Sequence, residues 1–202
     1  MLKVIDNFLT KSYHKELEQL MDSANFSWYY NSHISYDSGK APGHPNRLYE
    51  TGFSHIFWDY RTGGLRDNSF AWLWKGGLSQ IQDTTNQDTI LRSRGDMTMY
   101  VHEPFVHDPH IDFNFPNIST ILYINDSSGD TVFYKEKVDK HEDIAEIKDF
   151  HEIDRVTPKA NRFVMFDGNY VHTGSSPHNH KNRILINSNF CKGGLPKWWE
   201  NS

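Results

Sequence analysis

Two histidines and one aspartate have the residue types and the spacing of a metal site. His110-Ile111-Asp112 places an imidazole and a carboxylate two residues apart, and such residues point to the same face of a β-strand. His172 follows much later, at the end of a segment that favours β-structure. Two imidazoles and one carboxylate occupy one face of an octahedron and leave positions for a bidentate ligand and O2. The sequence therefore predicts an Fe(II) site at His110, Asp112 and His172.

An arginine begins the next predicted strand, Arg183-Ile184-Leu185-Ile186-Asn187. With a period of two, Arg183, Leu185 and Asn187 share one face of that strand. A guanidinium is a bidentate hydrogen-bond donor suited to a carboxylate. We expect Arg183 to bind the distal carboxylate of a dicarboxylate co-substrate, and Asn187 to face the same pocket.

Other histidines and one aspartate lie near this motif and compete for the metal. His107 is three residues before His110, which on a strand puts it on the opposite face. Asp108 shares the parity of the ligands, and we expect it beside them in a supporting role. His178 and His180 fall in a polar run and are expected in an exposed loop. A His-x-Asp motif is common by chance in a chain with 12 histidines, so the prediction depends on the combination with His172 and Arg183.

Short strands are predicted around these residues. Strands 118–124 and 131–134 flank the turn residues 125–130, and this pattern predicts a hairpin. The charged residues 135–152 are expected to form a solvated hairpin or loop without a catalytic role. A run of short strands with turn signals is typical of an antiparallel sandwich or barrel. Further strands are predicted at 162–167, 170–174 and 183–190, and residues 90–101 are expected to form a strand pair or one long bulged strand.

The first part of the chain has a different pattern. A strand is expected at 4–9 and a helix at 11–24, and a second helix at 68–81 is weakened by Gly76-Gly77 near its end. Residues 31–50 are expected to form a long loop. The helices precede the strands, so we expect them to pack on the outside of one sheet. A chain of 202 residues suits one domain, with residues 1–90 as support and substrate-side loops and 91–192 as the core.

The composition narrows the class of protein. The chain is 37% hydrophobic and 23% charged, with a net charge of −5, and without a basic stripe a nucleic-acid partner is not expected. A single cysteine, Cys191, allows no internal disulfide and favours a reducing compartment, the cytoplasm. The apolar runs are too short to span a membrane.

The order His110-Ile111-Asp112, His172 and Arg183 resembles the 2-oxoglutarate/Fe(II)-dependent dioxygenases of the double-stranded β-helix fold. Residues 162–174 resemble the strand and turn that lead to the distal histidine of that family. Residues 121–125 and 129–133 resemble a strand pair of its prolyl-4-hydroxylase-like branch, which includes uncharacterised members from marine phages and bacteria. The resemblance covers most of residues 1–30 and 95–190 and is weak over 31–90.

The resemblance implies a mainly β fold with flanking α-helices, built on a double-stranded β-helix (jelly-roll, cupin-like) core with the N-terminal helices packed on one sheet. It implies Fe(II), 2-oxoglutarate and O2 as cofactors, with Tyr100 and Tyr123 close to the 2-oxoglutarate that Arg183 binds. The reaction implied is hydroxylation of a prolyl or other amino-acid residue or of a small molecule, with release of succinate and CO2.

Two other functions stay open at this point. An AlkB-like nucleic-acid demethylase carries a second arginine six residues after the first, where this chain has Asn189. A cupin-like metal-binding protein that is not an oxygenase has no need of Arg183. The sequence determines neither the substrate, free or protein-bound, nor the oligomeric state, and we expect specificity to depend on residues 31–90 and 135–152.

Overall fold

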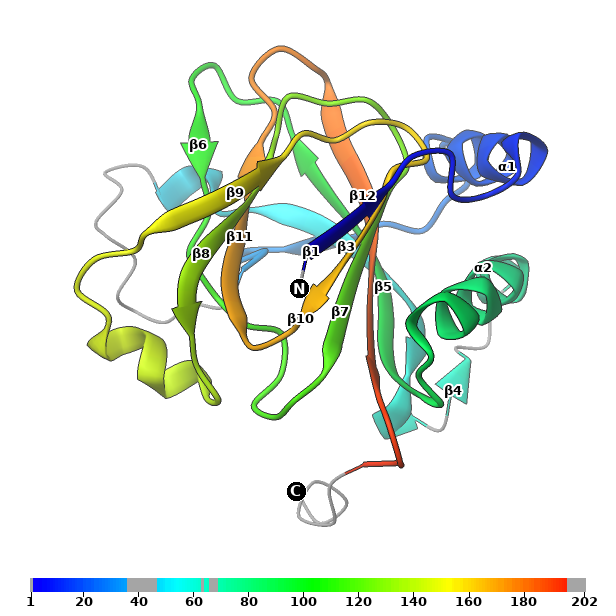
Figure 1. Ribbon diagram of the computed structural model, residues 1–202. Coiled ribbons are helices and arrows are strands. Elements are labelled where there is room, and N and C mark those ends of the chain that lie inside the picture. The colour runs from blue at the N-terminus through cyan, green and yellow to red at the C-terminus, as the bar shows by residue number, and fades with distance from the viewer. Residues whose placement is uncertain (1, 36–46, 63, 66–68, 196–202) are drawn as a thin grey trace.

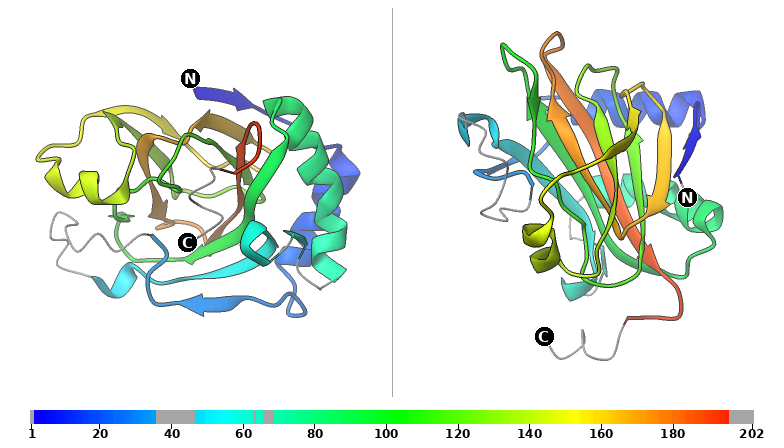
Figure 2. Two further views of the ribbon diagram at one scale, coloured as in Figure 1. Left: turned by 90° about the horizontal axis from the view of Figure 1, so that it is seen from below. Right: turned by 60° about the vertical axis from the view of Figure 1, so that its left-hand side comes forward.

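Two β-sheets face each other, and two helices cover the outer face of the larger sheet (Figure 1). The computed structural model describes residues 2–35, 47–62, 64–65 and 69–195. Seen from below, both helices lie on one side of the molecule and the smaller sheet lies on the other (Figure 2). Residues 36–46 of the loop expected at 31–50 fall outside the described residues.

The larger sheet is antiparallel and has the strand order β1-β10-β7-β12-β5-β3-β2, with β4 paired to β3. The strand expected at 4–9 is β1, which pairs with β10 and starts and ends earlier than predicted. The strands of this sheet are β1 (Leu2–Ile5), β2 (Tyr29–Asn31), β3 (Gly52–Asp59), β4 (Gly64–Leu65), β5 (Thr89–Met99), β7 (Ile118–Tyr123), β10 (Phe163–Asp167) and β12 (Asn182–Cys191).

The smaller sheet has the order β6-β11-β8-β9. From β7 onward the chain passes repeatedly between the two sheets, because β7, β10 and β12 lie in the larger one and β8, β9 and β11 in the smaller one. This winding is that of a double-stranded β-helix. The strands of this sheet are β6 (Phe105–Val106), β8 (Thr131–Lys137), β9 (Glu152–Val156) and β11 (Tyr170–Ser176).

The predicted hairpin between residues 118–124 and 131–134 is wrong. β7 pairs with β10 and β12, whereas β8 pairs with β11 and β9. Residues 125–130 turn the chain as expected, but they carry it from one sheet to the other. A turn signal predicts a change of direction, and it leaves open which strands become hydrogen-bonded neighbours.

Both predicted helices are present. α1 (Lys11–Met21) is shorter than predicted, and α2 (Ser69–Thr85) continues past residue 81. The Gly76-Gly77 pair lies inside α2 and does not end it. Gly77 is needed there because a Cβ at this position would clash with the fully buried Trp74 ring. The glycine therefore makes room for an indole whose Nε1 donates to Ser93 Oγ on β5 at 2.8 Å. No helix in the described part of the chain combines the length and the apolar character needed to cross a membrane.

Side-chain alternation along the central strands separates the apolar core from the future site. On β12, Ile184, Ile186 and Phe190 pack under the helices with the main core. The other face of β12 points between the sheets, as does the corresponding face of β5. Antiparallel register places four pairs of residues side by side on this inner face: Arg183 with Thr98, Leu185 with Asp96, Asn187 with Arg94, and Asn189 with Arg92.

The charged segment between β8 and β9 is more ordered than predicted. It contains a short 3-10 helix, η3 (His141–Glu146), in which Ile144 is buried against Ile111 and Val171. Its edges also belong to strands, since β8 extends to Lys137 and β9 begins at Glu152. The segment thus packs directly on the loop that carries the predicted metal ligands.

Candidate metal centre and its two cavities

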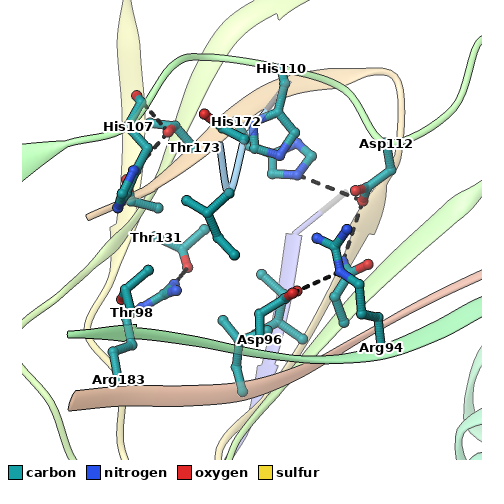
Figure 3. Close-up of a pocket in the computed structure, with 16 residues that line it drawn as sticks. Arg94, Asp96, Thr98, His107, His110, Asp112, Thr131, His172, Thr173 and Arg183 are labelled. Carbon is teal, nitrogen blue, oxygen red and sulfur yellow. Dashed lines mark hydrogen bonds and ion pairs between the residues drawn. The ribbon is translucent and has the colours of Figure 1, made fainter. Parts of the chain in front are cut away.

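The three predicted metal ligands lie together in the structure (Figure 3). His110, Asp112 and His172 each offer one ligand atom, and these atoms lie within 4.8 Å of one another. The backbones of the two histidines exchange hydrogen bonds of 2.9 Å in both directions, and this isolated bridge sets their rings side by side. His110 and Asp112 lie outside regular strands, so the backbone bridge, and not the predicted strand alternation, brings them to His172.

Each imidazole is oriented by a carbonyl oxygen. His110 Nδ1 lies 3.0 Å from the carbonyl oxygen of Asp108, and His172 Nδ1 lies 2.9 Å from that of Tyr170. An Nδ1–H that donates to these carbonyls leaves the Nε2 lone pair for a metal. Burial, with His172 nearby, lowers the pKa of His110 to about 4, so this ring is neutral at neutral pH. Asp108 therefore has the supporting position expected of it, through its backbone.

The carboxylate of Asp112 is surrounded by hydrogen-bond donors. Arg92 Nη2 donates to Oδ1 at 3.1 Å. Burial by itself would raise the pKa of Asp112, but His172, Arg92 and His110 hold it well below its usual range. The carboxylate is therefore ionised, as a metal ligand must be. The donors to Oδ2 are Ser119 Oγ at 2.9 Å, Asn189 Nδ2 at 2.8 Å and Asn187 Nδ2 at 3.3 Å.

Arg183 is a buried cation, 6% exposed. Its Nη2 donates to Thr131 Oγ1 at 2.7 Å, and its Cζ lies 5.6 Å from the centre of the Tyr123 ring. Among the described residues, its Nε has no hydrogen-bond partner and no carboxylate lies within ion-pair distance. A buried charge without a counter-charge is costly, so this guanidinium is suited to an anionic ligand.

The triad and Arg183 line one narrow cavity, which we call the inner cavity. Its volume is about 70 Å³, and it extends from the two histidines and Asp112 to Arg183, Thr98 and Thr131 (Figure 3). One water needs roughly 10–15 Å³ on this scale, so the space suits a slender molecule. Gly174 also lines it, and a Cβ there would lie 3.2 Å from Arg183 Nη1.

His107 also lines the inner cavity, so its predicted placement on the opposite face is wrong. The two-residue strand β6 ends at Val106, and without a strand the alternation rule does not apply to His107. Its ring bridges Glu50 Oε2 at 3.2 Å and Ser176 Oγ at 2.9 Å. His178 and His180 are exposed, as predicted.

The two tyrosines expected near the co-substrate have different places. Tyr123 is fully buried and donates to Thr131 Oγ1 at 2.6 Å, which puts it behind Arg183 and outside the cavity wall. Tyr100 follows the last residue of β5 and is 55% exposed, because the chain leaves the strand just before it. The structure thus places Tyr100 away from the inner cavity, whereas Asn187 lines it as expected.

Sequence reasoning missed the contribution of β5. Arg94, Asp96 and Thr98 all line the inner cavity, and Arg94 Nε forms an ion pair with Asp96 Oδ1 at 2.7 Å. Thr98 Oγ1 is buried and has no hydrogen-bond partner in the described part of the chain. The available signal was the recurrence of polar residues with a period of two, from Arg92 to Thr98, on a strand that must also pack against a helix.

A second and wider cavity, which we call the outer cavity, adjoins the first. It has a volume of about 510 Å³ and shares Arg94 and Asp112 with the inner cavity. Its further walls come from the end of β3 with η2 (Tyr60–Thr62), from the loop after Asp112 and from η3. Residues that line it include Ile56, Asp59, Arg61, Leu91, Phe113 and Glu142.

Comparison with known proteins gives structural neighbours only. No family model and no curated protein matches the sequence. An oxidoreductase of the 2OG-Fe(II) oxygenase family from Burkholderia pseudomallei is similar with a TM-score of 0.63 at 7% identity, over 97% of this chain and 88% of that one. A prolyl hydroxylase from Trichoplax adhaerens, in complex with a hypoxia inducible factor peptide fragment, has a TM-score of 0.58 at 12% identity, over 95% and 83%.

HygX from Streptomyces hygroscopicus, with nickel and 2-oxoglutarate bound, has a TM-score of 0.54 at 11% identity, over 98% of this chain and 85% of that one. At these identities the likeness concerns the fold. Together with the winding between two sheets, it confirms the predicted mainly β architecture with a double-stranded β-helix core and helices on one sheet.

Proposed function

We propose that this protein is an Fe(II)- and 2-oxoglutarate-dependent dioxygenase that hydroxylates an organic substrate, an amino-acid residue or a small molecule, with release of succinate and CO2. One observation carries the proposal. A facial set of two imidazoles and one carboxylate lies in the same narrow cavity as Arg183, a buried cation without a carboxylate partner among the described residues. The similar folds of HygX, with nickel and 2-oxoglutarate bound, and of an oxidoreductase of the 2OG-Fe(II) oxygenase family support it.

The donor atoms fit Fe(II). His110 is neutral at neutral pH, Asp112 is ionised, and the Nδ1 atoms of His110 and His172 lie against carbonyl oxygens. This combination of two nitrogen donors and one oxygen donor with open positions is typical of non-haem ferrous sites. Bound iron, with 2-oxoglutarate and O2, would supply the oxidising chemistry, and the chain would supply its orientation.

The far end of the inner cavity fits a carboxylate. Arg183 would provide the charge that one carboxylate of 2-oxoglutarate requires, and that carboxylate would in turn neutralise the buried guanidinium. Thr131 Oγ1 accepts hydrogen bonds from both Arg183 and Tyr123, so its own hydrogen is left for the ligand. Thr98 offers a further hydroxyl without a described partner. The other end of the dicarboxylate would then reach the metal ligands.

The AlkB-like alternative gains no support from the position that distinguishes it. Asn189 stands where that group carries a second arginine, and it is fully buried. Its side chain donates to Asp112 and to Ser119, so it helps to hold the carboxylate and faces no binding surface.

Anaerobic titration tests the proposal. The Fe(II)-loaded protein is expected to develop a visible charge-transfer absorption on addition of 2-oxoglutarate, and Arg183→Gln should weaken binding by at least about 100-fold, since it removes charged hydrogen bonds of about 1.5–3 kcal/mol each. Arg183→Lys should retain part of the affinity, and the exposed Arg155→Gln should behave as the native protein. Fe(II) binding without 2-oxoglutarate binding would instead indicate a metal-binding protein that is not an oxygenase.

A further inference from the structure

The outer cavity is the place for a second ligand beside the metal ligands. Asp112 and Arg94 lie in the walls of both cavities, so a molecule in the outer cavity would meet the co-substrate at the metal site. At about 510 Å³ against about 70 Å³, the outer cavity also accepts a bulkier molecule. If the proposed function holds, this is where the oxidised substrate binds.

Arg94 is the cation that can bind a ligand at the end of this cavity nearest the metal ligands, whereas Arg61 lies on η2 at another wall. Its Nε pairs with Asp96 at 2.7 Å, and its other nitrogens form no hydrogen bond or ion pair that the structure records among the described residues. Its strand partner is Asn187, whose side chain touches Asp112, so the guanidinium lies next to the metal ligands. Arg92 differs, because its Nη2 is already engaged by Asp112, Asn187 and Asn189.

Two carboxylates of the same cavity form no ion pair with a described residue, although Asp59 lies across the ladder from Arg92. Asp59, at the end of β3, accepts a backbone hydrogen bond from Arg61 at 2.9 Å, and Glu142 is exposed on η3. Neither of them forms an ion pair with a described residue. Ile56, Leu91 and Phe113 provide apolar wall between these charges. The cavity thus combines guanidinium groups, of which that of Arg94 lies next to the metal ligands, with two carboxylates away from those ligands and an apolar surface.

We propose that the outer cavity binds a small zwitterion, a free amino acid, with its carboxylate on Arg94, its ammonium group towards Asp59 and Glu142, and its side chain against the apolar wall. This rests on the proposed function for its consequence, that the amino acid is the molecule hydroxylated. The backbone of a residue within a polypeptide carries neither charge, so it would give Arg94 and both carboxylates no ionic ligand while displacing their water. The structure therefore favours a free amino acid over a peptide segment.

The test uses free L-amino acids, their carboxamides and their N-acetyl derivatives as probes. Binding is followed by saturation-transfer NMR on the protein loaded with Zn(II) and 2-oxoglutarate. At least one amino acid should bind, and its carboxamide and N-acetyl derivative should each bind at least about tenfold more weakly, as expected for the loss of one charged contact. Succinate release from the Fe(II) protein should depend on the same amino acid.

Substitutions test which charged group of the amino acid each protein side chain binds. Arg94→Gln should weaken amino-acid binding at least about tenfold and bind acid and carboxamide alike, and it should weaken 2-oxoglutarate binding by a clearly smaller factor. Asp59→Asn combined with Glu142→Gln should remove the discrimination against the N-acetyl derivative. Arg155→Gln, on the surface of β9, is the matched control and should change none of these values. Thermal unfolding of each variant verifies that it is folded.

Three results would overturn the inference. The first is that none of the amino acids binds to protein that does bind 2-oxoglutarate. The second is equal binding of an acid and its carboxamide by the native protein. The third is an equal loss of 2-oxoglutarate and amino-acid binding in Arg94→Gln, which would assign Arg94 to the co-substrate. Amino-acid binding by protein that fails to bind 2-oxoglutarate would refute the proposed function and leave this site standing.

Discussion

The inner and outer cavities share Arg94 and Asp112, yet they are built differently. The far wall of the inner cavity consists of neighbouring strands, with Arg183 on β12 directly opposite Thr98 on β5. The outer cavity is completed by connecting segments, namely η2, η3 and the loop after Asp112. Strands fix the direction of a side chain, whereas connections vary more readily between proteins. The difference suits an invariant co-substrate on one side and a particular substrate on the other.

The two cavities also differ in the charges that they present to a ligand. The end of the inner cavity presents one buried guanidinium without a described carboxylate partner, which selects an anion. The outer cavity presents both signs, through Arg94 on one wall and Asp59 and Glu142 on others. Substitutions that affect one ligand and spare the other can therefore break or sharpen the distinction.

The largest effect is expected at the residue common to both cavities and to the metal. Asp112→Asn keeps the shape and removes the charge, and it should lower Fe(II) affinity by at least about 100-fold, together with every function that depends on the metal. Ser119→Ala removes one hydrogen bond to Asp112 and is expected to cost about tenfold. Metal titration with an indicator measures both. Native-like affinity in Asp112→Asn would remove this residue from the ligand set.

The inner cavity should be disabled by one methyl group. A Cβ at Gly129 would clash with the carbonyl oxygen of Ser175 and lie 2.8 Å from Arg183 Cδ. Gly129→Ala should therefore displace Arg183 and weaken 2-oxoglutarate binding by at least about tenfold. It should also lower the free energy of unfolding by about 1–3 kcal/mol. Isothermal titration and thermal unfolding measure these two effects.

The outer cavity gives the contrast for this variant, since amino-acid binding to the metal-loaded Gly129→Ala protein should stay near native. Gly76→Ala is the control, because its Cβ would meet nothing closer than Tyr13 Oη at 3.8 Å, and an alanine inside a helix is stabilising by up to about 1 kcal/mol. Equal loss of both ligands in Gly129→Ala would show that the cavities are not separable.

The outer cavity should respond to its η3 wall. His141 Nε2 lies 2.7 Å from the carbonyl oxygen of Ile111, and its backbone N–H donates to Asn114 Oδ1 at 2.9 Å. His141→Ala should loosen η3 and weaken amino-acid binding by about fivefold, the effect of about 1 kcal/mol, with 2-oxoglutarate affinity unchanged. His151→Ala, in the same charged segment but exposed, should affect neither ligand. A larger loss of affinity for 2-oxoglutarate than for the amino acid would contradict the assignment of η3 to the outer cavity.

The smallest effects are expected at the two tyrosines that the sequence placed near 2-oxoglutarate. Tyr123→Phe removes the hydrogen bond to Thr131, which also accepts from Arg183. It should weaken 2-oxoglutarate binding by about fivefold because Arg183 is held less firmly. Tyr100→Phe, at an exposed position beyond β5, should change the affinity by less than about twofold. The same titration ranks them, and a greater effect at Tyr100 would mean that this residue reaches the co-substrate.

The sequence by itself determined the elements and the residues whose relations are local. Period-two alternation identified most strands and put Arg183 and Asn187 on one face of β12, and period 3.6 identified both helices. The sequence also identified His110, Asp112 and His172 as a candidate ligand set, and the structure brings these residues together for a reason that the sequence pattern does not contain. His110 and Asp112 converge because a backbone bridge to His172 holds the loop, which no pattern within residues 110–112 contains.

The tertiary structure decided everything that depends on which segments become neighbours. Turn residues 125–130 look the same whether they close a hairpin or carry the chain to another sheet, and only long-range pairing separated β7 from β8. His107 faces the inner cavity since the short β6 ends before it. The register of β5 against β12 placed Thr98 beside Arg183 and Arg94 beside Asn187. The register of a strand is set by which of its faces becomes buried when it packs against other strands. Both cavities therefore depend on the assembled sheets and could not be read from the sequence of one strand.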